Sequence, residues 1–170
     1  ALKESLPPIG LDYPEDAALI YSLPDNHSWM QSVDGFPALI PDPWLNARIT
    51  TLHACSDIWA VGANVNSAQA VITLPEVSSE HQEVLLKQCL GGIQSALEPQ
   101  GASLVGGHTC ESRTPLIQPI GFGIQISIVV NGFLKSSQIR YEKGGMQPGD
   151  KLLVTRALGS GVIFAGSMKG

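Results

Sequence analysis

Residues 120–132 read IGFGIQISIVVNG, and this stretch decides the fold class of the chain. Its run of apolar and β-branched residues is typical of a buried strand. The Asn131-Gly132 pair at its end is a strong signal for a two-residue turn, after which a second strand returns antiparallel to the first. The stretch therefore predicts a sheet that contains at least one long antiparallel hairpin.

The rest of the chain mixes further strands with helices. Residues 44–61 contain neither Gly nor Pro and repeat apolar side chains at helical spacing, with Asp42 as the N-cap and Gly62 as the terminator. Residues 79–97 form a second helix that begins with a capping box of Ser79 and Gln82, and residues 159–161 open a third. Shorter strands are predicted over residues 17–21, 28–33, 68–74, 102–105 and 151–155, and the three prolines of residues 35–43 predict an ordered loop. This mixture favours an α+β domain with a mixed sheet over a regular parallel fold.

Composition excludes several classes of function. The 170 residues suit one domain, and the net charge of −5 without a Lys/Arg cluster argues against a nucleic-acid binder. No apolar stretch reaches the ~20 residues of a membrane span. The three cysteines form no CxxC pair, which predicts neither a zinc site nor a disulfide framework and favours a cytoplasmic location. Charged residues make up 15% of the chain, against about 25% in a typical domain, so we expect a partner or a further segment to cover part of the surface.

Three aspartates are candidates for chemistry. Asp16 and Asp34 flank short strands and could converge at one edge of the sheet, while Asp57 lies late in the first helix among apolar neighbours. Carboxylates gathered in this way repel one another unless a cation holds them, and Mg²⁺ takes one or two carboxylates together with phosphate oxygens. The alternative is that each aspartate forms a turn, a helix cap or an ion pair.

The second candidate is the sequence Gly106-Gly107-His108-Thr109, which follows a predicted strand. Paired glycines let backbone N–H groups approach an anion, and the Thr109 hydroxyl adds a donor, so the motif suits a phosphate. An ordinary turn is the alternative, since the spacing and the Lys of a Walker motif are absent. His108 could be a ligand, an acid–base group, a nucleotide contact or a hydrogen-bonded loop residue.

His53 and the cysteines complete the candidates. His53 precedes Asp57 by four residues, so both can share one helix face, either as part of a site or as a simple His–Asp pair. Cys110 is the one thiol beside the glycine motif, and Cys89 is predicted to lie in the core.

Taken together, these motifs resemble the selenophosphate synthetase family, which belongs to the aminoimidazole ribonucleotide synthetase superfamily of ATP-using enzymes. The resemblance covers nearly all of residues 12–165, and its ordered motifs favour the selenophosphate branch. The matching stretches are Glu15–Leu19, Ser32–Asp34, Asp42-Pro43 with Arg48-Ile49, Ser56–Ala63, Gly106–Thr109, and Pro148–Asp150 with Leu152–Gly161.

The resemblance implies a fold and a chemistry. The fold is the N-terminal domain of the superfamily, a mixed, largely antiparallel sheet with helices packed on one face, whose sheet pairs with a second copy in a homodimer. The activity makes selenophosphate, AMP and phosphate from selenide, ATP and water with Mg²⁺, an enzyme of the selenide, water dikinase type. By position, the implied magnesium ligands are Asp16, Asp34 and Asp57. The implied ATP-binding residues are Asp34, Asp57, Gly107, His108 and Thr109.

The resemblance also implies a domain division. Residues 1–15 are expected to be an irregular N-terminal segment, residues 16–155 the ATP- and Mg²⁺-binding, dimer-forming domain, and residues 156–170 the start of a linker to a C-terminal domain. We expect the chain to be a fragment that is inactive alone.

Three departures from the family leave alternatives open. A glycine-rich segment with a catalytic Cys or selenocysteine and a Lys does not precede Asp16, the acidic pair is Glu15-Asp16 where the family often has two Asp, and His53 stands where the family commonly has Asn. One alternative is another ATP-dependent enzyme of the superfamily, such as a thiamine monophosphate kinase or a hydrogenase maturation protein. The other is a non-catalytic dimerisation or regulatory module.

Overall fold

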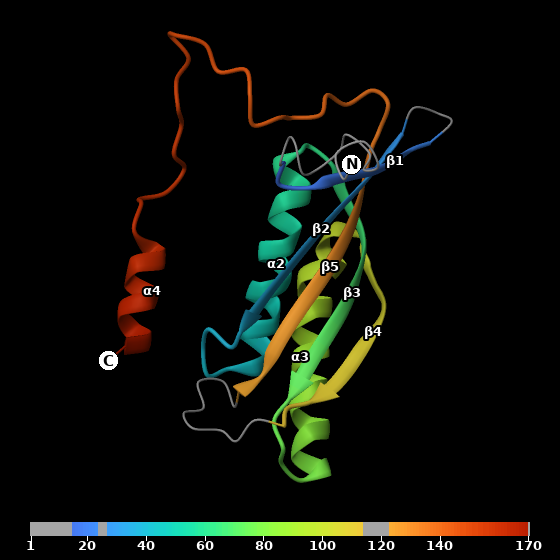
Figure 1. Ribbon diagram of the computed structural model, residues 1–170, viewed down its shortest axis with the longest axis vertical. Helices are drawn as coiled ribbons and strands as arrows, with labels where there is room; N and C mark the ends of the chain where they lie inside the picture. Colours follow the sequence, from blue (N-terminus) through green and yellow to red (C-terminus); the bar gives the residue numbers. More distant parts are fainter. Residues whose placement is uncertain (1–14, 24–26, 114–122, 170) are drawn as a thin grey trace, which may run out of the picture.

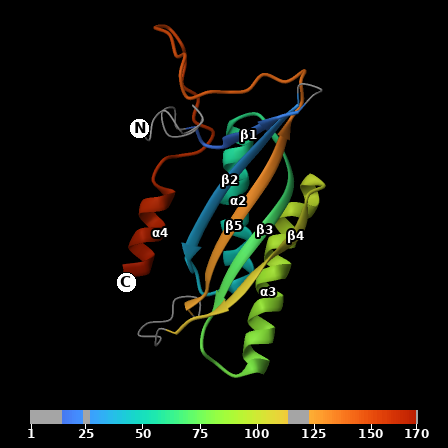
Figure 2. The same cartoon turned by 45° about the vertical axis from the view of Figure 1, so that its right-hand side comes forward.

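The computed structural model describes residues 15–23, 27–113 and 123–169. Five strands form one sheet in the order β1-β2-β5-β3-β4, in which β3 and β4 are parallel and the other neighbours antiparallel. Helices α2 and α3 lie on one face of this sheet and leave the other face open (Figure 1, Figure 2). The bounds are β1 Ala18–Ser22, β2 Ser28–Pro37, α2 Pro43–Ala60, β3 Asn64–Leu74, α3 Ser79–Leu97, a 3₁₀ turn Glu98–Gln100, β4 Ser103–Glu111, β5 Gln125–Leu134 and α4 Ser160–Lys169. The predicted α+β class, with helices on one face of a mixed sheet, is confirmed.

Helix α2 packs closely on both the sheet and α3. Its start is fixed by Asp42, whose carboxylate accepts a hydrogen bond from the N–H of Leu45 at 2.9 Å, as predicted. Gly62 ends the helix with a φ of 82°, a conformation that glycine adopts without a Cβ penalty. On the side of α3, an added Cβ at Gly92 would overlap the carbonyl oxygen of Trp44, so the backbones of the two helices approach closely there. The small residue at this position therefore allows α2 and α3 to pack closely.

The predicted hairpin at Asn131-Gly132 is wrong, because β5 continues straight through both residues. Gly132 lies between β2 and β3, and a Cβ there would collide with the side chain of Ile58 on α2. The side-chain oxygen of Asn131 accepts hydrogen bonds from Trp29 Nε1 at 3.2 Å and from Gln31 Nε2 at 2.9 Å. Both residues serve packing across the sheet, so a sequence that is typical of a turn is held in a central strand.

Two further strand boundaries differ from the prediction. β2 extends to Pro37, into the predicted loop of residues 35–43, and pairs with β5 along its whole length. β4 extends to Glu111, so the sequence predicted to be a phosphate-binding loop, Gly106–Thr109, is itself strand and pairs with β3. The partner strand supplies the hydrogen bonds that extend both elements, and local sequence does not show this partner.

The start of α3 also differs in detail. The N-cap is Ser78 rather than Ser79, and its side chain makes no capping hydrogen bond. The Gln82 amide instead donates to the carbonyl of Pro75 at 3.0 Å and to a carboxylate oxygen of Glu111 at 2.5 Å. The predicted capping box is therefore wrong, because Gln82 ties the helix to the loop before it and to β4.

After β5 the chain leaves the sheet and runs to α4, which stands apart from α2 and α3 (Figure 1). Residues 151–155 are not a strand, contrary to the prediction, and Leu152 and Leu153 are exposed. No neighbouring strand within the described residues offers them a hydrogen-bonding edge. The predicted helix start at residues 159–161 is confirmed by α4, whereas residues 1–14 of the predicted N-terminal segment lie outside the described residues.

Candidate functional site

Asp57 and Asp16 lie together where the last turn of α2 meets the chain that enters β1. The link between them is Ser32 of β2, a buried side chain that is 8% exposed. Its hydroxyl donates to Asp57 Oδ2 at 2.5 Å and lies 3.5 Å from the backbone carbonyl oxygen of Asp16. One oxygen of Asp57 is thus held by a buried donor. Two of the three predicted aspartates are brought to one place.

Lys143 supplies a positive charge at this pair of carboxylates. Its ammonium lies 2.9 Å from Asp16 Oδ1, and its backbone N–H donates to the Glu15 carboxylate at 3.1 Å. The hydrogen bond that Lys143 donates to Asp16 raises the pKa of Lys143. Burial lowers this pKa by a smaller amount, and the negative charges of Asp16, Glu15 and Asp57 raise it again. The Lys143 ammonium is therefore paired with Asp16, and its backbone is bound to Glu15.

Asp34 forms a separate pair one step further along β2. Its Oδ2 lies 2.7 Å from Nδ1 of His53, and the imidazole meets the ring of Phe36 edge-on at 4.8 Å between centroids. The expected pairing of His53 with Asp57 is replaced by this contact, because β2 presents Asp34 to the helix face that carries His53. Asp34 thus has one oxygen engaged and is not gathered with Asp16 and Asp57 around a common point.

The glycine motif lies on the opposite edge of the sheet. Asp34 is opposite Ile128, which is opposite Ala70, which in turn is opposite Gly107. Three interstrand spacings, about 14 Å, therefore separate Asp34 from Gly107. A single copy of the chain does not bring the motif to the acidic residues.

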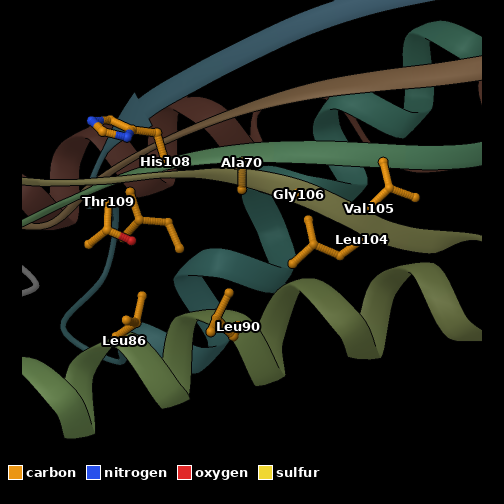
Figure 3. Close-up of a pocket in the computed structure, with 10 residues that line it drawn as sticks. Ala70, Leu86, Leu90, Leu104, Val105, Gly106, His108 and Thr109 are labelled. Carbon is orange, nitrogen blue, oxygen red and sulfur yellow. The ribbon is translucent and has the colours of Figure 1, made fainter.

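The motif roofs an apolar hollow of about 430 Å³ between β4 and α3. Leu86 and Leu90 of α3 line its floor, and Thr109 points toward it, whereas His108 lies on the other side of the strand (Figure 3). An added Cβ at Gly107 would collide with the backbone of Ala70, so this glycine permits close pairing of β4 with β3. None of the described residues that line the hollow is acidic.

The thiols show which cysteine is accessible. Cys55 and Cys89 are buried, and Cys110 is partly exposed. Burial raises the pKa of Cys89 to about 11 and that of Cys55 in the same direction, so both thiols stay protonated at neutral pH. The prediction that Cys89 belongs to the core is confirmed.

Of the three aspartates predicted to bind magnesium, Asp16 and Asp57 are linked through Ser32, and Asp34 is paired with His53. Within the described residues, no three His, Cys, Asp or Glu side chains gather closely enough to hold a metal. Mg²⁺, however, usually takes only one or two carboxylates and completes its shell with water and phosphate oxygens. Asp16 and Asp57 supply that number, and the ammonium of Lys143 shows that a cation is stabilised there.

Comparison with known proteins shows the family. The family model "AIR synthase related protein, N-terminal domain" matches residues 14–130, more than half of the chain. The chain belongs to this family. As an AIR synthase related domain it has a sheet-and-helix fold in which the acidic pair, the Asp34–His53 pair and the glycine strand occupy three separate places.

Two relatives confirm the resemblance to the selenophosphate branch. The chain is 31% identical over 164 residues to a selenide, water dikinase of Clostridioides difficile strain 630. The aligned residues cover 95% of the chain and 42% of the relative. The chain is 31% identical over 155 residues to a selenide, water dikinase of Nitratidesulfovibrio vulgaris strain DSM 19637 / Miyazaki F, covering 91% and 41%. The chain therefore spans about two fifths of the length of these relatives.

Solved structures of other proteins show a similar fold. The structure described as "AaThiL complexed with AMPPCP and TMP" matches with a TM-score of 0.62 at 17% identity, over 78% of this chain and 39% of that one. The "HypE-HypF complex" matches with a TM-score of 0.55 at 20% identity, over 79% and 41%. At these identities the likeness concerns the fold alone.

Sequence reasoning missed Lys143 and the role of Ser32. A signal existed for Ser32, since residues two apart on a strand share a face and Ser32 therefore lies on the same face as Asp34. No signal existed for Lys143, which lies far along the chain from Glu15 and Asp16 and reaches them from a segment without regular structure.

Proposed function

We propose that the chain is the ATP- and Mg²⁺-binding domain of a selenophosphate synthetase-like enzyme, which makes selenophosphate, AMP and phosphate from selenide, ATP and water. The observation that carries the proposal is the pair of Asp16 and Asp57, linked through Ser32 and neutralised by a lysine. The similarity to selenide, water dikinases over 95% and 91% of the chain supports this choice of reaction.

The chemistry of this site is charge neutralisation. Phosphoryl transfer needs the phosphates to be positioned and their developing charge to be stabilised, which bound Mg²⁺ supplies. Ser32 holds Asp57 Oδ2 and so orients the carboxylate, leaving Oδ1 for a ligand. Asp16 is paired through Oδ1 with the ammonium of Lys143, so a cation that uses this oxygen competes with the lysine. Asp34 lies two residues after Ser32 on β2, is paired with His53, and serves as the nucleotide contact.

We assign residues 16–155 to the binding and dimer-forming part and residues 156–170 to the start of a connection to a second domain. The homodimer forms through the open sheet face, which α2 and α3 leave uncovered (Figure 2). Val33 and Val71 are 64% and 43% exposed there, an apolar surface that a second copy would bury. Because Gly107 and Asp34 lie far apart within one copy, the second copy supplies Gly107, His108 and Thr109 to the phosphates.

The cytoplasmic location stays a prediction, and no helix among the described residues has the length and apolar character to cross a membrane.

The other branches of the family are distinguished by their products. The likeness to the AaThiL and HypE structures supports another ATP-dependent enzyme equally well, since it concerns only the fold. Selenide-dependent release of AMP by the full-length protein supports the selenophosphate assignment. Release of ADP that does not depend on selenide contradicts it, and no turnover together with no nucleotide binding indicates the non-catalytic module.

Calorimetric titration with AMPPCP, with and without Mg²⁺, tests the binding itself in the full-length protein. The variant Asp57→Asn keeps the size of the side chain and removes its charge, so Mg²⁺-dependent binding should weaken about tenfold or more. The matched control is Asp42→Asn at the other end of α2, because Asn caps a helix as well as Asp does and the site is untouched. Equal binding by both variants contradicts the assignment of Asp57.

A further inference from the structure

Lys143 is held at the acidic pair by its backbone as well as by its charge. The N–H of Tyr141 donates to the carbonyl of Val61 at 3.2 Å, and the N–H of Lys143 donates to the Glu15 carboxylate at 3.1 Å. The segment after β5 is thus fastened beside the end of α2 by two main-chain contacts. These contacts leave the Lys143 side chain, which is 54% exposed, free to turn about its own Cα.

The ammonium engages one of the two carboxylate oxygens through which Asp16 can bind a metal. It lies 2.9 Å from Asp16 Oδ1, and the charges of Glu15 and Asp57 act on it as well. A divalent cation that binds Asp16 through this oxygen must displace the ammonium. Since the backbone of Lys143 stays attached, the displaced ammonium remains within the length of one lysine side chain of the site. The anions that arrive there with the metal are the phosphates of the nucleotide.

We propose that Lys143 is a phosphate-binding residue of this site, which rests on Asp16 while the site is empty and turns to the nucleotide phosphates when the magnesium nucleotide binds. This inference rests on the proposed function and adds a residue to it. Lys143 then has two opposite effects: it competes with Mg²⁺ for Asp16 and it attracts the nucleotide. Loss of a residue with a purely structural role would change Mg²⁺ binding and nucleotide binding in the same direction.

The test measures Mg²⁺ alone and Mg²⁺ with AMPPCP by calorimetry on the full-length protein and on Lys143→Met. Loss of an exposed ion pair frees Asp16, so Mg²⁺ alone should bind about two- to fivefold more tightly to the variant. Loss of a charge-assisted hydrogen bond to phosphate should weaken AMPPCP binding about tenfold or more. Lys143→Arg restores a donor to the phosphates and should recover most of the nucleotide binding.

The matched control is Lys87→Met, since Lys87 forms an exposed ion pair with Glu83 on α3, away from the site, and its loss should change neither titration. Unchanged AMPPCP binding by Lys143→Met overturns the inference and leaves the proposed function standing. Parallel weakening of both titrations also overturns it, because a structural role has that effect. Absence of AMPPCP binding by the unaltered protein overturns the proposed function, and this inference with it.

Discussion

Replacing each glycine of the Gly106-Gly107 pair by alanine tests whether the motif is strand or loop. At Gly107 the new Cβ would lie 3.0 Å from the backbone N and C atoms of Ala70 and would overlap its carbonyl oxygen. Backbone in a paired strand cannot move aside, so overpacking should cost about 1–3 kcal/mol. At Gly106 the nearest atom would be Gln69 Nε2 at 4.0 Å, and alanine in an open strand position should gain about 0.5–1 kcal/mol.

The two variants should therefore differ by at least about 1.5 kcal/mol in the free energy of unfolding. Urea denaturation measures this difference directly, and thermal unfolding should show a gap of at least about 3–6 °C between the midpoints. The two glycines are adjacent and receive the same substitution, so each variant is the control for the other. Equal midpoints would refute the close pairing of β4 with β3, and would return the motif to the loop that its sequence predicts.

Three further results are expected. Gly92→Ala should destabilise the protein by about 1–3 kcal/mol in urea denaturation, because the new methyl overlaps the carbonyl of Trp44, and unchanged stability would contradict the packing of α2 on α3. Burial raises the pKa of Cys89 to about 11, so the unfolded chain loses its proton first and stability should fall as the pH rises from about 9 to about 11. Cys89→Ala should flatten that part of the pH profile, and a profile like that of the unaltered protein would contradict the assignment. In a random mixture of Asp57→Asn and His108→Ala subunits, about a quarter of the nucleotide sites should be intact if each site takes one residue from each copy, whereas a site within one copy leaves none.

Local signals predicted the helices well. Residues 44–61 and 79–97 combine apolar spacing with nearby caps or terminators, and the observed α2 and α3 match them within one residue at each end. Asp42 and Gly62 act where predicted because capping depends only on neighbours in sequence.

Local turn signals misled the prediction at positions where residues distant in the sequence determine the structure. Asn131-Gly132 is typical of a turn, but hydrogen bonds from Trp29 and Gln31 and the close approach of Ile58 keep it in β5. Gly106-Gly107 is extended by pairing with β3 for the same reason. Tertiary partners outweigh turn propensity at both positions.

The candidate site was predictable only in part. Asp16 was expected to converge with Asp34, but Ser32 links it to Asp57 instead, and Asp34 pairs with His53. The spacing of four residues between His53 and Asp57 allowed their pairing, but the imidazole instead pairs with Asp34 on β2. Lys143 comes from a distant irregular segment, and no periodicity or motif announces such a contact.

The most direct test of the proposed magnesium nucleotide site is a crystal structure of the full-length protein with Mg²⁺ and AMPPCP. We expect a metal about 2.0–2.1 Å from a carboxylate oxygen of Asp16 and of Asp57, coordinated also by phosphate oxygens. The Lys143 ammonium should have left Asp16 for a phosphate. A nucleotide bound elsewhere, or a metal that contacts neither aspartate while Lys143 still pairs with Asp16, would contradict it.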